Sequence, residues 1–296
     1  MPSPSLTGCQ AYVTGDILRI NVLGPLEVVV DDRARTPKTP KIRTVLALLI
    51  ANPNETVFTE HLIEELWGGK VPRSAAGTVQ TYIYQLRRAI QIDEPEIGLV
   101  TKPSGYQLRV NPERLDIHQF ERLAEQGSAA LDAGDLSRAS HLLYRALRLW
   151  RGPAFGGVEC GQRLNAYIVR LEENKLAVLE RRIEADLRQG RHRELVGELK
   201  ALVATHPLHE WLYSRLMLTL YLSGRRCEAL EVYQAFRRRL REELGLDPSP
   251  ELQRLQRALL TGSIPGYGHP RGMQVGAGIS TGGEAEPALV VCRPAS

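Results

Sequence analysis

The sequence predicts a mainly α-helical chain in which a small segment of mixed strands and helices, residues 18–112, precedes an all-helical segment, residues 115–261. Two stretches of alternating, β-branched residues, 18–30 and 99–110, predict strands, and no such stretch follows until about residue 262. Helical periodicity with glycine-containing turns dominates the rest. The flanking residues 1–17 and 262–296 show neither pattern, and we expect a flexible N-terminus and a disordered tail there.

The N-terminal segment is predicted to contain two strands, three helices and a hairpin, in that order. Gly24 and Pro25 divide the first stretch into two strands. The helices are expected at residues 41–51, from Thr59 to about residue 67, and from Ser74 to about residue 90, with Thr59 and Ser74 as caps. The hairpin turns at residues 103–105. This order is that of an α+β winged helix-turn-helix domain, and the third helix is the one that such a domain exposes.

The C-terminal segment has the character of a helical repeat. Two Gly-Arg turns, at Gly190 and Gly224, lie 34 residues apart, which is the period of the tetratricopeptide helix pair. A further turn at Gly134 falls out of this register because a long helix intervenes. We therefore expect an all-α, tetratricopeptide-like domain, with helices near residues 118–132, 135–150, 163–189, 192–204, 208–223, 225–244 and 250–260.

Composition excludes several classes of protein. The net charge is only +4, and residues 1–112 hold 12 Lys and Arg against 11 Asp and Glu, so bulk charge does not indicate a nucleic-acid partner. No apolar run of about 18 residues and no signal peptide occur, and we expect a cytoplasmic protein without a membrane contact. The scattered cysteines and histidines predict no metal site and no cofactor. No catalytic motif appears, so an enzyme is not expected.

The third predicted helix has two chemically distinct faces. At 100° per residue its apolar side chains, Val79, Ile83, Leu86 and Ile90, fall in a sector about 60° wide. The opposite face contains no Asp or Glu, and its hydroxyl, amide, aromatic and guanidinium groups suit base edges in a major groove. A merely solvated face is the alternative interpretation. The candidates for reading bases are Thr78, Thr81, Tyr84, Gln85 and Arg88.

Candidates for phosphate contacts surround that helix. Arg73 and Ser74 lie at its start, where free N–H groups and the helix dipole attract an anion. Lys102 lies at the hairpin tip, and Lys41 and Arg43 open the first helix. Trp67 ends the second helix, where core packing is favoured over a phosphate contact through its indole N–H.

Four runs of the N-terminal half are distinctive, namely residues 40–50, 62–68, 74–88 and the hairpin at 101–108. These runs closely resemble the Streptomyces antibiotic regulatory protein family. In the second half, residues 116–121, 149–152 and 239–251 are similar to landmarks of the family's bacterial transcriptional activator domain. The resemblance covers roughly residues 18–261, and the uninterrupted run at 74–88 is its most specific part.

The resemblance implies a pathway-specific activator of a secondary-metabolite, or antibiotic, gene cluster. Such proteins bind direct repeats in double-stranded DNA upstream of promoters, as a head-to-tail dimer, and contact RNA polymerase and its sigma factor. By position, Thr78, Thr81, Tyr84, Gln85 and Arg88 would face the groove, and the DNA backbone would be held by Arg73, Arg87 and Lys102.

Two further expectations concern regulation and the competing function. The winged domain also resembles that of OmpR/PhoB-type response regulators, but no receiver domain precedes it, so aspartate phosphorylation is not the expected switch. No phosphate loop follows, so we expect a small, stand-alone member without an ATPase module. The alternative is a protein-interaction scaffold that does not bind DNA, which an acidic face on the third helix would have favoured.

Overall fold

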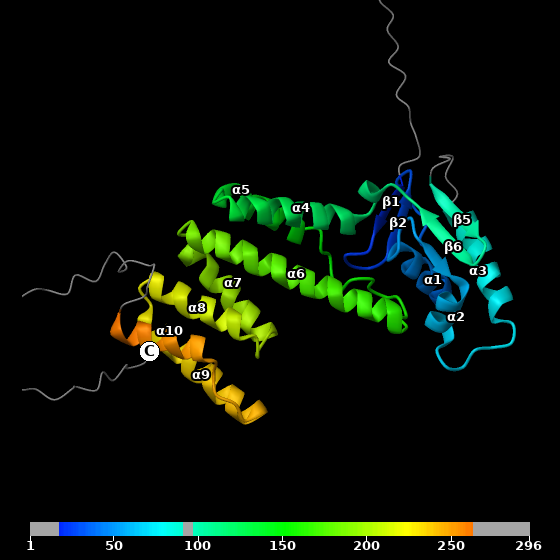
Figure 1. The fold of residues 1–296 in the computed structure, drawn as a ribbon. Helices are drawn as coiled ribbons and strands as arrows, with labels where there is room; N and C mark the ends of the chain where they lie inside the picture. Colours follow the sequence, from blue (N-terminus) through cyan, green and yellow to red (C-terminus); the bar gives the residue numbers. More distant parts are fainter. Residues whose placement is uncertain (1–17, 91–96, 263–296) are drawn as a thin grey trace, which may run out of the picture. The chain divides into compact units, whose positions relative to one another are not determined.

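The computed structural model describes residues 18–90 and 97–262 (Figure 1). The expectations for residues 1–17 and 263–296 concern segments outside these ranges. The chain divides into two compact units, Met1–Arg182 (unit 1) and Ile183–Ser296 (unit 2). Unit 1 contains the strands, the first helices and the start of the helical segment, so it holds all the candidate DNA-contacting residues.

The first sheet of unit 1 has three antiparallel strands in the order β1-β2-β3. They are β1 (Leu18–Asn21), β2 (Glu27–Val30) and β3 (Arg33–Ala34). The predicted pair of strands around Gly24 is confirmed, and alternate side chains of β1 and β2 are buried, as a one-sided sheet requires. The sequence did not predict β3, which has only two residues.

Three helices follow, α1 (Pro40–Ile50), α2 (Thr59–Trp67) and α3 (Ala75–Ala89), and each contacts the other two. Proline opens α1, where its missing N–H costs nothing. All three predicted helices are confirmed. The cap expected at Thr59 is wrong, because Phe58 takes the N-cap position and Thr59 is already helical. Ser74 does occupy the N-cap position of α3, but its side chain makes no capping hydrogen bond.

The second sheet forms the wing. Its strands are β4 (Thr56–Phe58), β5 (Gly98–Lys102) and β6 (Gly105–Arg109), in the order β4-β6-β5. The predicted hairpin is confirmed, and β4 is an addition to it. Gly105 is required here, because a Cβ at this position would collide with the backbone of Val57 in β4. The close approach of β4 and β6 thus depends on a glycine.

The helical part of unit 1 shares its core with the winged part. It comprises the 3-10 turn η1 (Pro112–Arg114), α4 (Asp116–Asp132), α5 (Leu136–Leu147) and the beginning of α6 (Gln162–Arg188). One hydrophobic cluster contains Leu46 and Leu49 of α1 together with Phe120 and Phe155. Residues on both sides of the predicted boundary at 112–115 are therefore buried together.

Unit 2 consists of helices that pack against one another. These are α7 (His192–Thr205), α8 (Glu210–Leu222), α9 (Arg226–Leu244) and α10 (Pro250–Thr261). The turns at Gly190 and Gly224 have φ angles of 81° and 80°, which glycine adopts without strain. Because α7 contacts α8 and α8 contacts α9, neighbouring antiparallel helices pack together as in a tetratricopeptide-like repeat. Within the described ranges, every helix is too short or too polar to cross a membrane.

Candidate nucleic-acid interface

Helix α3 separates a buried stripe from an exposed face. Val79, Ile83 and Leu86 are buried against the core of unit 1, and Ile90 at the helix end is buried with them. On the other side, Thr81, Tyr84, Gln85 and Arg88 are exposed, while Thr78 is partly buried. Tyr84 is 60% exposed, which is unusual for an aromatic side chain and leaves its ring available. The faces predicted from the periodicity are confirmed.

The threonine hydroxyls on this face are engaged within the helix. Thr78 Oγ1 donates to the carbonyl of Ser74, and Thr81 Oγ1 donates to that of Gly77, each at 3.0 Å. This leaves the methyl group of Thr81 as its main contribution to a groove. A methyl group suits contact with the 5-methyl of thymine better than hydrogen bonding to a base edge.

Arg87 connects α3 to the wing. Its Nε donates to the carbonyl of Leu99 at 3.1 Å, and its Nη2 donates to Thr101 Oγ1 at 2.6 Å. These bonds hold β5 against the exposed helix, so the two elements present one surface. The sequence did not predict this structural contact, because it joins residues in different elements. The phosphate contact that the family resemblance implies for Arg87 stays a prediction.

The start of α3 and the tip of the wing carry the remaining candidates. Arg73 and Ser74 are exposed at the N-terminus of α3, and the first turn of this helix contains no acidic residue. Lys102 is the last residue of β5 and is partly buried next to the exposed Pro103 and Ser104. Backbone N–H groups at a helix start and a nearby cation are the features that bind a phosphate in many proteins.

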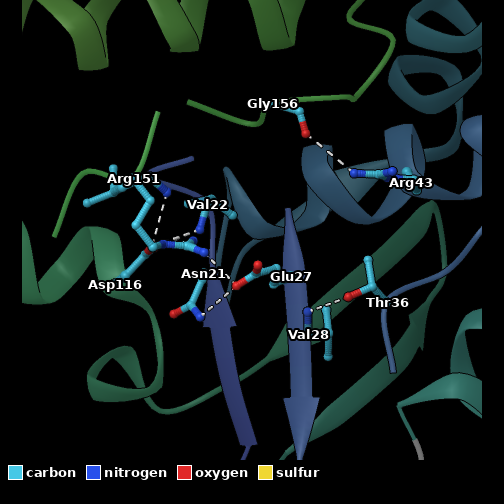
Figure 2. A network of polar contacts seen from close by, with 10 residues as sticks. Asn21, Val22, Glu27, Val28, Thr36, Arg43, Asp116, Arg151 and Gly156 are labelled. Carbon is cyan, nitrogen blue, oxygen red and sulfur yellow. Dashed lines mark hydrogen bonds and ion pairs between the residues drawn. The ribbon is translucent and has the colours of Figure 1, made fainter. Parts of the chain in front are cut away.

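Three candidates make contacts within the protein, and the sequence predicted only the core packing of Trp67. Lys41 Nζ donates to the carbonyl of Leu66 at 3.0 Å and lies 4.9 Å from the ring centroid of Trp67. The Trp67 ring packs against the core, as the favoured interpretation expected. Arg43 extends toward the 151–161 segment, where its Nη2 donates to the carbonyl of Gly156 at 3.4 Å (Figure 2). Their phosphate contacts stay predictions.

A buried carboxylate, Asp116, fastens the start of α4 to the first sheet (Figure 2). It accepts hydrogen bonds from the backbone N–H of Val22 at 2.9 Å and from that of Leu23 at 3.0 Å. Arg151 lies 3.6 Å from the same carboxylate and also pairs with Glu27 at 2.5 Å. Burial raises the pKa of Asp116 above its ordinary value, since desolvation outweighs the hydrogen bonds and the arginine charge.

A second buried carboxylate, Glu65, fastens α2 to α6. Its oxygens accept hydrogen bonds from the backbone N–H of Arg163 at 3.0 Å and of Leu164 at 3.2 Å. These are N–H groups of the first turn of α6, which have no partner inside the helix. Arg163 also donates through Nε to the neighbouring Glu64 at 3.1 Å. The helix preceding α3 is therefore bound to the helical segment by charge-assisted hydrogen bonds.

This architecture defines a winged helix-turn-helix regulator joined to helical repeats. It combines three packed helices with a wing, and its exposed third helix contains no Asp or Glu. Comparison with known families agrees with this class. Residues 33–108 match the family described as "Transcriptional regulatory protein, C terminal", and residues 115–260 match "Bacterial transcriptional activator domain". The chain belongs to the Streptomyces antibiotic regulatory protein family, whose members are transcriptional regulators and not enzymes.

Individual relatives support this membership. The regulatory protein DnrI of Streptomyces peucetius is 44% identical, over 82% of this chain and 92% of the relative. The transcriptional regulator RedD of Streptomyces coelicolor is 34% identical, over 87% of this chain and 74% of the relative. A solved structure of Mycobacterium tuberculosis EmbR has a TM-score of 0.79 at 33% identity, covering 84% of this chain and 66% of EmbR.

Proposed function

We propose that this protein activates transcription of a secondary-metabolite (antibiotic) gene cluster by binding direct repeats in DNA upstream of promoters and recruiting RNA polymerase. The observation that carries the proposal is the acid-free exposed face of α3 opposite its buried stripe. Membership of a DNA-binding activator family supports it. The site of action would be the cytoplasm.

The side chains of α3 and the wing have separate roles in this proposal. Gln85 offers a donor and an acceptor that match an adenine edge, and Arg88 suits a guanine or a phosphate. Arg73 and Lys102 would contact phosphates on either side of the groove, which fixes the position of α3 without reading sequence. Because Arg87 ties the wing to α3, groove and backbone contacts would form together.

Direct repeats require a head-to-tail pair of protomers, and this gives the proposal a geometric test. The probe is a promoter duplex from the gene neighbourhood of this protein, bound by the full chain and mapped by DNase protection. We expect protection of two repeats in the same orientation. Inserting about five base pairs, roughly half a helical turn, between the repeats should weaken binding, because the protomers would then lie on opposite sides of the duplex.

The controls are an insertion of about ten base pairs, which restores the helical phase, and a duplex with one repeat inverted. Equal binding to the direct and inverted arrangements would contradict the head-to-tail pair. Transcription from the same template with purified RNA polymerase holoenzyme tests activation separately. A protected promoter whose transcript yield does not rise would refute the activator role and leave the DNA-binding role standing.

A further inference from the structure

Helix α5 presents a basic face to solvent. Arg138, His141 and Arg145 of the helix and its C-cap residue Arg148 are all exposed and follow one another at steps of three and four residues. This spacing places them in a sector roughly 80° wide. Tyr144 lies beside them and is 54% exposed. We call these five residues the α5 basic face.

The orientation of this face is fixed by packing. The opposite side of α5 is buried, and α5 contacts α4 along its length. Gly127 of α4 lies so close to Leu143 that a Cβ at residue 127 would clash with the leucine side chain. The helix therefore cannot rotate to hide its arginines without losing this contact.

The α5 basic face lacks the ion pairs that several cations of unit 1 make. Arg122 pairs with Glu113 at 3.0 Å, and Arg181 pairs with Asp132 at 3.5 Å. In contrast, α5 itself contains no Asp or Glu, and no ion pair joins its four basic residues to a carboxylate of the described ranges. Arg145 and Arg148 are like charges three residues apart, which disfavours the helix slightly. An acidic partner would offset this repulsion.

We propose that the α5 basic face docks onto an acidic protein surface of RNA polymerase holoenzyme. This rests on the proposed function, since it identifies the part of the chain that contacts the polymerase. Within unit 1, α5 and α3 lie at opposite ends (Figure 1), so a duplex held by α3 does not pass along α5. Arginine and tyrosine are also the residues enriched in protein interfaces.

The test separates polymerase contact from DNA contact. The variant R138Q/R145Q/R148Q removes three charges from exposed positions, and R193Q/R254Q/R257Q removes three from exposed positions of unit 2 as a matched control. Binding of purified holoenzyme to the immobilised full chain, without DNA, should weaken at least about fivefold for the first variant, because each interfacial charge contributes modestly to affinity. The control should bind like wild type. Tyr144→Ala should also weaken holoenzyme binding.

Two further measurements on the same variants exclude the alternatives. Affinity for the promoter duplex should stay within about twofold of wild type, because the phosphate contacts of α3 and the wing are intact. Weaker DNA binding with a flatter salt dependence would overturn the proposal in favour of a DNA-backbone contact. Unchanged holoenzyme binding would show a merely solvated face. Failure of wild type to bind its promoter would refute the proposed function, whereas the holoenzyme assay would still report on the α5 basic face.

Discussion

The carboxylate of Glu65 accepts a hydrogen bond of 3.2 Å from the backbone N–H of Leu164, 99 residues further along the chain. Asp116 makes the reciprocal connection, because this residue of the helical segment accepts from the backbone of Val22 in the winged part. Each part thus supplies a buried carboxylate to backbone N–H groups of the other. The winged part, which contains α3, is therefore attached to the start of α4 through Asp116 and to the start of α6 through Glu65.

Replacing Glu65 should destabilise unit 1 strongly. In Glu65→Ala, the N–H groups of Arg163 and Leu164 lose their acceptor at a partly buried helix start. We expect the free energy of unfolding to fall by roughly 2–4 kcal/mol, the cost of leaving such groups unpaired. Urea unfolding followed by tryptophan fluorescence measures it. The matched control is Glu125→Ala at an exposed position of α4, and its free energy of unfolding should lie within about 0.5 kcal/mol of wild type. Equal losses for both variants would argue against the role of Glu65.

Asp116 should make the free energy of unfolding of unit 1 depend on pH. Its pKa is raised above the ordinary value of 3.8, so the folded chain holds this proton more tightly than the unfolded chain does. Its contribution to the free energy of unfolding is therefore fully present below pH 3.8 and is lost as pH rises through the raised pKa.

Comparison with Asp116→Asn isolates this contribution, because the other titrating groups are common to both proteins. We expect the stability of wild type relative to Asp116→Asn to decrease as pH rises from below 3.8 and then to level off. Urea titrations at a series of pH values measure the difference. A difference that grows with pH would mean that the hydrogen bonds and Arg151 outweigh desolvation.

Gln85 should govern base preference at one position. Gln85→Ala removes an exposed amide from the α3 face, and we expect a loss of about 1–3 kcal/mol on the promoter sequence with relaxed specificity at a single base pair. Competition binding with duplexes substituted at each position measures this. Gln80→Ala is the matched control, since Gln80 is an exposed glutamine on the flank of the same helix. If Gln80→Ala relaxes the same position and Gln85→Ala does not, the assignment of the face is wrong.

Lys102 should affect all DNA sequences alike. Lys102→Ala removes a cation from the end of β5, and we expect weaker binding to promoter and random duplexes in the same proportion. The slope of log affinity against log salt should decrease by about 0.9, the value for one lost phosphate contact. Fluorescence anisotropy across a range of salt concentrations provides both quantities. A loss confined to the promoter duplex would instead place Lys102 among the base-reading residues.

Local patterns predicted most of the fold. Helices such as α3 and α5 agree with the periodicity because each has one buried stripe, and α6 and α8 are followed by the turns at Gly190 and Gly224. The strands β3 and β4 escaped prediction because they have two and three residues, too few to show alternation. They exist through pairing with β2 and β6, which only the tertiary structure supplies.

In the candidate site, too, local sequence patterns predicted one part and missed another. The exposed face of α3 depends on local spacing alone, so its residues were predictable from the sequence. The bonds of Arg87 to Leu99, and of Arg43 to Gly156, join residues that are 12 and 113 positions apart, and no local pattern indicates them. Glu65 and Asp116 resemble ordinary surface acids in the sequence. Their importance appears only once their burial and their backbone partners are known.

If the exposed face of α3 reads DNA sequence, the full chain should distinguish its promoter from other DNA. The affinity of the full chain for the promoter duplex is compared with that for a scrambled duplex of equal length and composition, from low to moderate salt. We expect preferential binding to the promoter and an affinity for both duplexes that falls steeply with salt. Equal affinity for the two duplexes, or an affinity that does not change with salt, would show that α3 does not read the sequence.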